Sequence, residues 1–107
     1  MKLMTKEIEK RLEKFPLYSQ DGKEGDAEVV CKFFAPVGSW TWYVLEGEKT
    51  EDGDWEFFGI VDNVDGHEYG YFTLSELAEV STPFGLKIER DKYFGNKRVK
   101  DLSLYGN

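Results

Sequence analysis

The chain has 107 residues, of which 40% are hydrophobic and 33% are charged, and its formal net charge is -7. This length predicts one domain over residues 1–107, and the composition excludes a disordered chain. No apolar run reaches the roughly 20 residues of a membrane span and the first residues are too polar for a signal peptide, so we expect a cytoplasmic protein without membrane contact. The single cysteine, Cys31, excludes an intramolecular disulfide and is expected to be a core residue.

The first expected element is a helix from Thr5 to Phe15. Apolar residues recur every three to four positions on one face of this segment, Thr5 is a natural N-cap, and Pro16 ends the helix. Residues 19–26 then form a loop with two glycines and alternating charges. Because this loop has no apolar anchor, we expect it to be mobile.

Four strands follow at close spacing, supported by their β-branched and aromatic residues. They are expected at residues 28–35, 40–48, 54–64 and 67–73. The strongest turn signal is the Asp65-Gly66 pair, which predicts a two-residue hairpin turn between the last two strands. Neither face of the second strand is plainly polar, so both faces of the sheet need cover. The N-terminal helix can cover one face, and the C-terminal third can cover part of the other.

The C-terminal third begins with a capping-box pattern from Thr73 to Glu76, which predicts a short helix after the fourth strand. Residues 86–94 alternate apolar and charged side chains, which favours an edge strand, with a short helix as the alternative. Leu102, Leu104 and Tyr105 indicate that the tail packs onto the domain. The predicted fold is therefore α+β, with an antiparallel sheet of four to five strands, an N-terminal helix and a short helix after the fourth strand.

Aromatic residues are concentrated in the middle of the chain, where 11 of the 17 lie between Phe33 and Phe72. Such rings either form the core or act as stacking platforms for nucleic acid. Only Lys32 and Lys49 are basic across residues 28–73, so an open aromatic face there would repel phosphate. The sequence thus argues against direct nucleic-acid binding and for a core role.

Charge is divided along the chain. Residues 20–80 carry 15 acidic and three basic side chains, whereas the first 19 residues carry five basic against three acidic and residues 81–107 carry six against three. If the two basic ends meet in space, the protein has a strong dipole and its basic end could bind an acidic partner or a phosphate. The simpler interpretation is solubility and internal charge pairing.

The sequence assigns no catalytic, cofactor-binding or metal-binding residue. The acidic turn at residues 51–56 lacks the ligand spacing of a calcium loop, and the lone His67 beside a hairpin turn has no evident catalytic partner. Neither a glycine-rich phosphate loop nor a serine-nucleophile motif is present. Enzyme activity is therefore unsupported, and no cofactor is expected.

Five sequence segments, taken in order, form a recognisable set: Lys32 to Pro36, Ser39 to Tyr43, Phe57 to Gly59, Tyr69 to Leu77 and Gly85 to Phe94. Together they resemble a bacterial family known as domain of unknown function 2958. The resemblance implies a bacterial protein of the kind often carried on plasmids and other mobile elements near DNA-processing or anti-restriction genes. It implies no established activity and transfers no catalytic residue.

The leading hypothesis is a small non-catalytic module, monomeric or a small oligomer, that binds an unknown protein partner. The candidate contact residues are Trp40, Trp42, Tyr43, Glu89, Arg90 and Asp91. For each of them, ordinary packing or surface pairing is the alternative. A second hypothesis is an acidic decoy that mimics DNA, which requires a spaced surface row of carboxylates. A third is a small enzyme, which requires a pocket joining Arg90, Glu89 or His67 to other polar groups.

Overall fold

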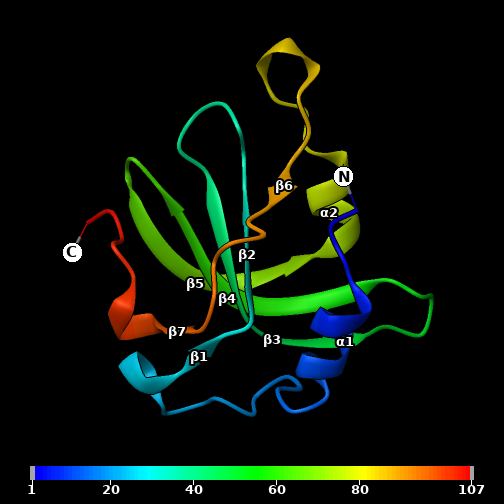
Figure 1. Cartoon of the computed structure of the whole chain (residues 1–107), viewed down its shortest axis with the longest axis vertical. Coiled ribbons are helices and arrows are strands. Elements are labelled where there is room, and N and C mark those ends of the chain that lie inside the picture. The colour runs from blue at the N-terminus through cyan, green and yellow to red at the C-terminus, as the bar shows by residue number, and fades with distance from the viewer. Residues whose placement is uncertain (1, 107) are drawn as a thin grey trace.

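The structure, a computed structural model, describes residues 2–106 and has an antiparallel sheet of five strands in the order β5-β4-β3-β2-β6 (Figure 1). The helices and strands are α1 (Lys6–Leu12), β1 (Glu28–Val29), β2 (Cys31–Phe34), β3 (Thr41–Lys49), β4 (Trp55–Asn63), β5 (Gly66–Thr73), α2 (Leu74–Glu79), β6 (Glu89–Arg90) and β7 (Lys97–Arg98). Three short 3₁₀ helices are η1 (Glu24–Asp26), η2 (Pro83–Gly85) and η3 (Val99–Asp101). The predicted α+β class is confirmed, including both predicted helices.

The N-terminal helix α1 begins as predicted, because the Thr5 hydroxyl accepts a hydrogen bond from the Ile8 amide at 3.1 Å. It ends at Leu12, earlier than the predicted Phe15. Phe15 precedes a proline, which disfavours helical backbone angles, and its carbonyl accepts a hydrogen bond from the Gly47 amide at 3.0 Å. The residues after Leu12 therefore connect α1 to the sheet and do not extend the helix.

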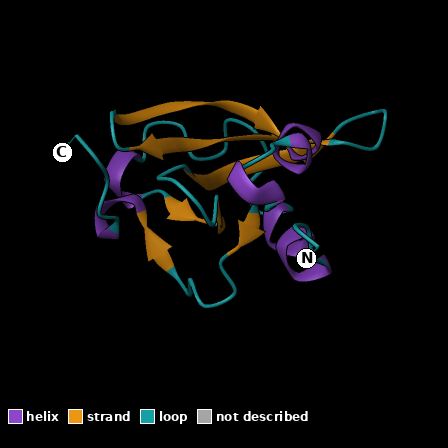
Figure 2. Ribbon diagram, turned by 90° about the horizontal axis from the view of Figure 1, so that it is seen from above, coloured by secondary structure: helices purple, strands orange, loops and turns teal. Residues whose placement is uncertain are grey.

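Both faces of the sheet are covered, as the sequence predicted. On one face α1 packs on Phe33 and Phe57, whose ring centroids are 6.2 Å apart, and both rings are fully buried. On the other face the C-terminal segment packs Phe94, Val99, Leu102 and Leu104 against Tyr43, Leu45 and Ile60. Figure 2 shows α1 near one end of the sheet and the C-terminal segment near the other end. The sheet thus separates two apolar clusters, each completed by one end of the chain.

The first predicted strand, residues 28–35, is two strands in the structure. The chain breaks at Val30, whose amide donates to the Val44 carbonyl at 2.7 Å. Before the break β1 pairs with β7 in a separate two-stranded sheet, and after it β2 pairs with β3 and β6. The predicted edge strand at 86–94 is present, but only Glu89 and Arg90 pair with β2.

The hairpin between β4 and β5 turns one residue earlier than predicted. Asn63 pairs with Gly66, so Val64 and Asp65 are the two turn residues, and Gly66, with a φ of 131°, begins β5. The Asn63 side chain accepts from the Asp65 amide at 2.8 Å, which stabilises this turn locally. The capping box at Thr73 and Glu76 is confirmed by hydrogen bonds in both directions, at 3.1 and 2.9 Å.

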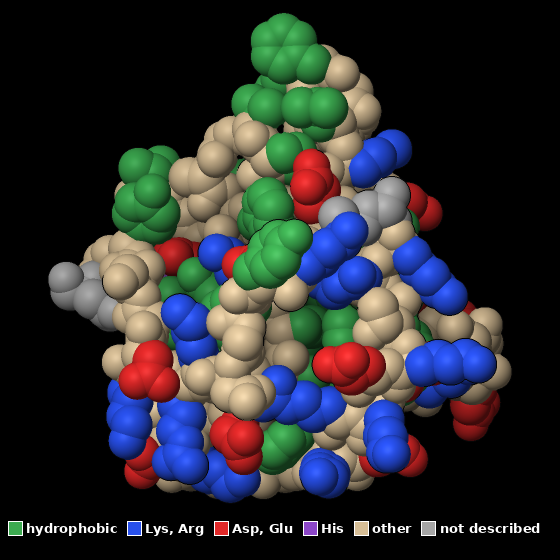
Figure 3. Space-filling view, viewed as in Figure 1, with side chains coloured by type: hydrophobic (Ala, Val, Ile, Leu, Met, Phe, Trp, Pro, Cys, Tyr) green, Lys and Arg blue, Asp and Glu red, His purple; other side chains and the backbone are tan. Residues whose placement is uncertain are grey.

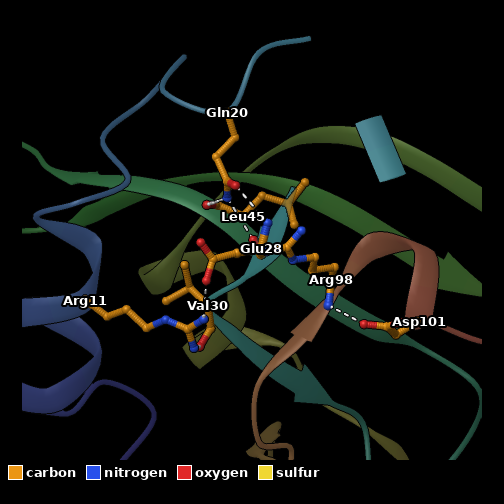
Figure 4. A network of polar contacts seen from close by, with 7 residues as sticks. All are labelled: Arg11, Gln20, Glu28, Val30, Leu45, Arg98 and Asp101. Atoms are coloured by element: carbon orange, nitrogen blue, oxygen red, sulfur yellow. Dashed lines mark hydrogen bonds and ion pairs between the residues drawn. The ribbon is translucent and has the colours of Figure 1, made fainter. Parts of the chain in front are cut away.

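The loop at residues 19–26, which we expected to be mobile for want of an apolar anchor, is held by polar contacts. The Gln20 side chain is only 5% exposed and bonds three backbone groups of β1 and β3, each at 2.7 Å (Figure 4). The buried Glu46 carboxylate accepts from the amides of Tyr18 at 2.7 Å and Gln20 at 2.8 Å. Hydrogen bonds from buried polar side chains therefore hold residues 19–26, a segment whose lack of apolar residues predicts a mobile loop.

Candidate functional site

Trp40 lies at one end of the sheet and is the most exposed tryptophan in the part of the chain that the structure describes. Its side chain is 47% exposed and stacks on Trp42, with ring centroids 5.9 Å apart and planes 21° from parallel. Trp42 itself is 9% exposed and belongs to the core. Alternation along the strand places both rings on the same face of the sheet, so the buried ring supports the exposed one.

Trp40 forms a wall shared by two hollows in the surface. The first, which we call the tryptophan cleft, has a volume of about 410 Å³, and its lining is mainly apolar. Its residues are Ala35, Val37, Trp40, Trp42, Val80, Ser81, Thr82 and Pro83. The second, which we call the acidic hollow, has a volume of about 340 Å³ and includes the carboxylates of Asp65 and Glu68. Trp40 thus places an apolar ring between an apolar and an anionic environment.

A projecting loop after α2 forms the far wall of the tryptophan cleft. Next to Pro83 in this loop, Phe84 is 90% exposed and has a φ of 67°, in the left-handed region that bulky residues rarely adopt. In Figure 3 hydrophobic side chains form the tip of the molecule where this loop projects. Nothing in the local sequence pattern around Pro83 predicts that it lies across a cleft from a tryptophan more than 40 positions earlier.

The other sequence-predicted candidates do not join Trp40 in one site. Tyr43 is on the opposite face, 7% exposed, with its ring 6.0 Å from that of Phe94. Burial, followed by the charges of Asp62 and Asp91, raises the pKa of Tyr43. Tyr43 is therefore a packing residue of the second apolar cluster.

The candidates in β6 and directly after it, Glu89, Arg90 and Asp91, contact the N-terminal segment and β2. Arg90 donates to the backbone carbonyls of Lys2 and Leu3, and so ties the N-terminal segment to the edge strand. Asp91 lies 3.8 Å from the Lys32 ammonium. Glu89 pairs in register with Phe34. In these contacts Arg90 and Asp91 are structural residues of the sheet edge.

The two basic ends of the chain meet, which was a condition left open by the sequence. A groove of about 470 Å³ is lined by Arg11 and Ile8 of α1 on one side and by Arg90 and Lys92 on the other. Lys and Arg side chains spread over the face formed by α1 and the C-terminal segment (Figure 3). This groove is the concave site that an enzyme hypothesis would use.

Two groups of the groove, Arg11 and Cys31, are in structural rather than activated states. The Arg11 guanidinium donates to the Val30 carbonyl at 3.1 Å and lies 3.6 Å from the Glu28 carboxylate (Figure 4). Burial raises the pKa of the Cys31 thiol at the groove to about 12, in spite of the nearby positive charges of Arg11 and Arg90. A thiol that stays protonated is the opposite of an activated nucleophile. His67 is outside the groove, in the acidic hollow, and its Nδ1 contacts the Tyr105 carbonyl at 2.6 Å.

Four of the carboxylates are not available to the spaced surface row that a DNA-mimicking decoy needs. Glu46 and Asp62 are 2% and 3% exposed. Asp54 accepts hydrogen bonds from the Ser75 amide and hydroxyl, and Glu76 caps α2. Within residues 2–106, no group of three or more His, Cys, Asp or Glu side chains is placed to hold a metal ion. Many of the acidic residues therefore serve local structure.

The family described as "Protein of unknown function (DUF2958)" matches residues 3–107. The chain belongs to this family. The match covers nearly the whole chain and confirms the resemblance seen in its sequence phrases. Comparison of this DUF2958 protein with curated proteins and with solved structures found no match. In the described part of the chain, no helix has the length and apolar character needed to cross a membrane. Membership of a family of unknown function shows which proteins the chain is related to and assigns it no activity. A function must therefore be inferred from the surface of the protein.

Proposed function

We propose that this protein is a non-catalytic module that binds a protein partner through Trp40 and the tryptophan cleft. The observation that carries the proposal is the position of Trp40, a half-exposed ring stacked on a buried one and shared by an apolar cleft and an acidic hollow. Tryptophan is enriched among the residues that contribute most to protein interfaces, where it works as a rigid anchor beside pockets.

The two hollows indicate what such a partner offers. An aliphatic side chain fits the tryptophan cleft, which is lined by Val37, Val80 and Pro83. A lysine or arginine next to it would face Asp65 and Glu68 in the acidic hollow. The occupant we propose is therefore a protein segment with an aliphatic residue flanked by basic ones. Phe84, next to Pro83 in the chain and 90% exposed, offers further apolar area to a partner.

The bacterial mobile-element setting implied by the family resemblance remains part of this proposal. It points to partners encoded near DNA-processing genes, and the genes beside the coding sequence test it. The decoy is not proposed, because Glu46 and Asp62 are buried and Asp54 and Glu76 are engaged in local hydrogen bonds.

The test is capture of partners from an extract of the native host at low salt, with three forms of the protein. Wild type is compared with Trp40→Ala and with the control Tyr93→Ala, which removes a ring that is 94% exposed and outside the cleft. We expect one protein to be retained by wild type and by Tyr93→Ala, and to bind Trp40→Ala at least about thirtyfold more weakly once purified. Equal retention by Trp40→Ala, or recovery of nucleic acid alone, would contradict the proposal. Thermal unfolding of the three forms shows whether Trp40→Ala remains folded.

A further inference from the structure

The outer edge of the sheet at β5 is open. In the strand order β5 is last, with β4 as its only neighbour in the five-stranded sheet. In Figure 2 it is the outermost strand, running into α2 with no described element beyond it. An open edge presents backbone N–H and C=O groups that can pair with another strand.

The register shows which amides face outward. Along an antiparallel strand, successive residues point their backbone groups alternately toward the neighbouring strand and away from it. The Thr73 amide donates to the Glu76 carboxylate at 2.9 Å, so Thr73 belongs to the outward set. The β4–β5 pairing is continuous from Asn63 to Glu56, so the same alternation places Tyr71 and Tyr69 in that set. No hydrogen bond from another described residue engages the amides of these two tyrosines.

The side chains along this edge form an aromatic surface. Tyr69 and Tyr71 are 50% and 53% exposed, and both flank Phe58 of β4. The Phe58 centroid lies 6.0 Å from that of Tyr69 and 5.0 Å from that of Tyr71. Tyr18, 64% exposed, reaches this surface, and its hydrogen bond is the main cause that raises the pKa of Tyr71. These four residues define the tyrosine surface.

The charged residues that line the hollow beside the tyrosine surface are all acidic. Residues 50–86 contain nine acidic side chains and no lysine or arginine. A hollow of about 500 Å³ beside Phe58 and Tyr69 is also lined by Asp21 and Glu24, both exposed. Glu46 also lines it, but both of its oxygens already accept backbone hydrogen bonds. Aromatic faces near carboxylates favour cationic side chains.

We propose that β5 binds an extended, basic segment of another protein by strand addition. The backbone of the segment pairs with the outward groups of Tyr69 and Tyr71, and alternate side chains of the segment lie over the tyrosine surface. Lysine or arginine at those positions contacts the tyrosine rings and faces Asp21 and Glu24. None of the four residues of the tyrosine surface lines the tryptophan cleft, so substitutions in this surface test the proposal independently of that cleft.

A second copy of this chain is a poorer occupant than a basic segment. Pairing of two β5 strands would bring two copies of the acidic region together, including the exposed Glu68 of each. Like charges in close approach destabilise such pairing. Nucleic acid is excluded by the same sign of charge.

The test is amide hydrogen exchange followed by NMR, with a peptide of about ten residues that alternates lysine and threonine. In the free protein we expect fast exchange at Tyr69 and Tyr71 and slow exchange at Glu68 and Gly70, which face β4. The lysine peptide should slow exchange at both tyrosines by at least about tenfold. A matched peptide with glutamate in place of lysine should leave it unchanged, and added salt should weaken the protection.

Two variants distinguish binding at the tyrosine surface from non-specific binding of the peptide. Tyr69→Ala should weaken peptide binding about three- to fivefold, and Tyr93→Ala should not change it. Slow exchange at Glu68 in Tyr69→Ala shows that the strand remains paired with β4. Binding without protection at Tyr69 and Tyr71 would overturn strand addition. Equal binding of the glutamate peptide would overturn the basic partner. Protection that grows with protein concentration alone, with the mass of a dimer, would assign the edge to a second copy.

Discussion

The acidic edge formed by β4, β5 and α2 differs from the basic side formed by α1 and the C-terminal segment in how its charges are used. On the basic side, Arg11 and Arg90 bond backbone carbonyls, and Lys100 lies 2.9 Å from Asp26. These cations hold the two ends of the chain against the sheet. At the acidic edge the backbone of β5 and the rings of Tyr69 and Tyr71 remain open to solvent.

The sign of the charge on a surface does not tell whether its charged side chains are free to bind a partner. The basic side looks like a binding surface by composition, yet Arg11, Arg90 and Lys100 all have partners within the chain. The acidic edge also engages some carboxylates, notably Asp54 and Glu76, but these contacts leave the β5 edge uncovered. Binding is therefore expected where backbone and rings are exposed, with charge selecting the partner.

The largest expected effect contrasts the centre of the sheet with its edge. Gly59 and Gly70 are paired across β4 and β5. A Cβ at Gly59 would lie 1.8 Å from the Tyr43 carbonyl oxygen, whereas a Cβ at Gly70 meets nothing within 4 Å. Gly59→Ala should lower the free energy of unfolding by about 3 kcal/mol or more, and Gly70→Ala should change it by less than about 1 kcal/mol, measured by urea denaturation. Equal effects would show that the edge is packed as tightly as the centre.

A smaller effect is expected at Glu46 of β3, whose carboxylate binds the backbone amides of Tyr18 and Gln20. In Glu46→Gln, the side-chain amide offers one acceptor in place of two, so one of the amides of Tyr18 and Gln20 loses its partner. Unfolding should become easier by about 2 kcal/mol. The control Glu68→Gln, at an exposed position on β5, should cost less than about 0.5 kcal/mol. An unchanged stability of Glu46→Gln in chemical denaturation would show that Glu46 does not hold the loop.

The smallest expected effect compares two carboxyls titrated by NMR. The hydrogen bond and charge of Lys100 lower the pKa of Asp26 below 3.8, and hydrogen bonds led by that from Ser75 lower the pKa of Asp54 below 3.8. Salt screens charges more than it weakens hydrogen bonds, so added salt should raise the pKa of Asp26 and leave that of Asp54 nearly constant. Because both values are lowered by folding, each carboxyl stabilises the fold above about pH 4 and loses this contribution as the pH falls through its folded pKa.

Two variants identify the causes of these shifts. Lys100→Ala should raise the pKa of Asp26 alone, and Ser75→Ala should raise that of Asp54 alone. A rise of both with salt would mean that the two regions hold their carboxyls in the same way.

Local patterns predicted much of the fold because they act within a few residues. The Thr5 N-cap, the Thr73 capping box and the alternating strands were read directly and are present. The anchored loop was missed because Gln20 and Glu46 are 26 positions apart and each looks like an ordinary surface residue. The break at Val30 was missed because the pairing of β1 with β7 depends on where the C-terminal segment returns.

The candidate site was predicted only in part, for a similar reason. Trp40 and Trp42 were selected as candidate contact residues. Strand alternation places both on one face of the sheet, where their rings stack. Their exposure differs because neighbouring elements cover one ring and not the other. Tyr69 and Tyr71 were read as core residues of an aromatic strand, and they are exposed because β5 is the edge of the sheet.

The sequence by itself determined the α+β class, the short helices with their caps, the aromatic core and the division of charge along the chain. These properties depend on periodicity and composition, which are local or additive. Tertiary structure alone decided that the two basic ends meet, that Glu46 is buried, and that β5 remains an open edge. Each of these depends on which distant segments come into contact, and the free energy of such contacts exists only in the folded arrangement.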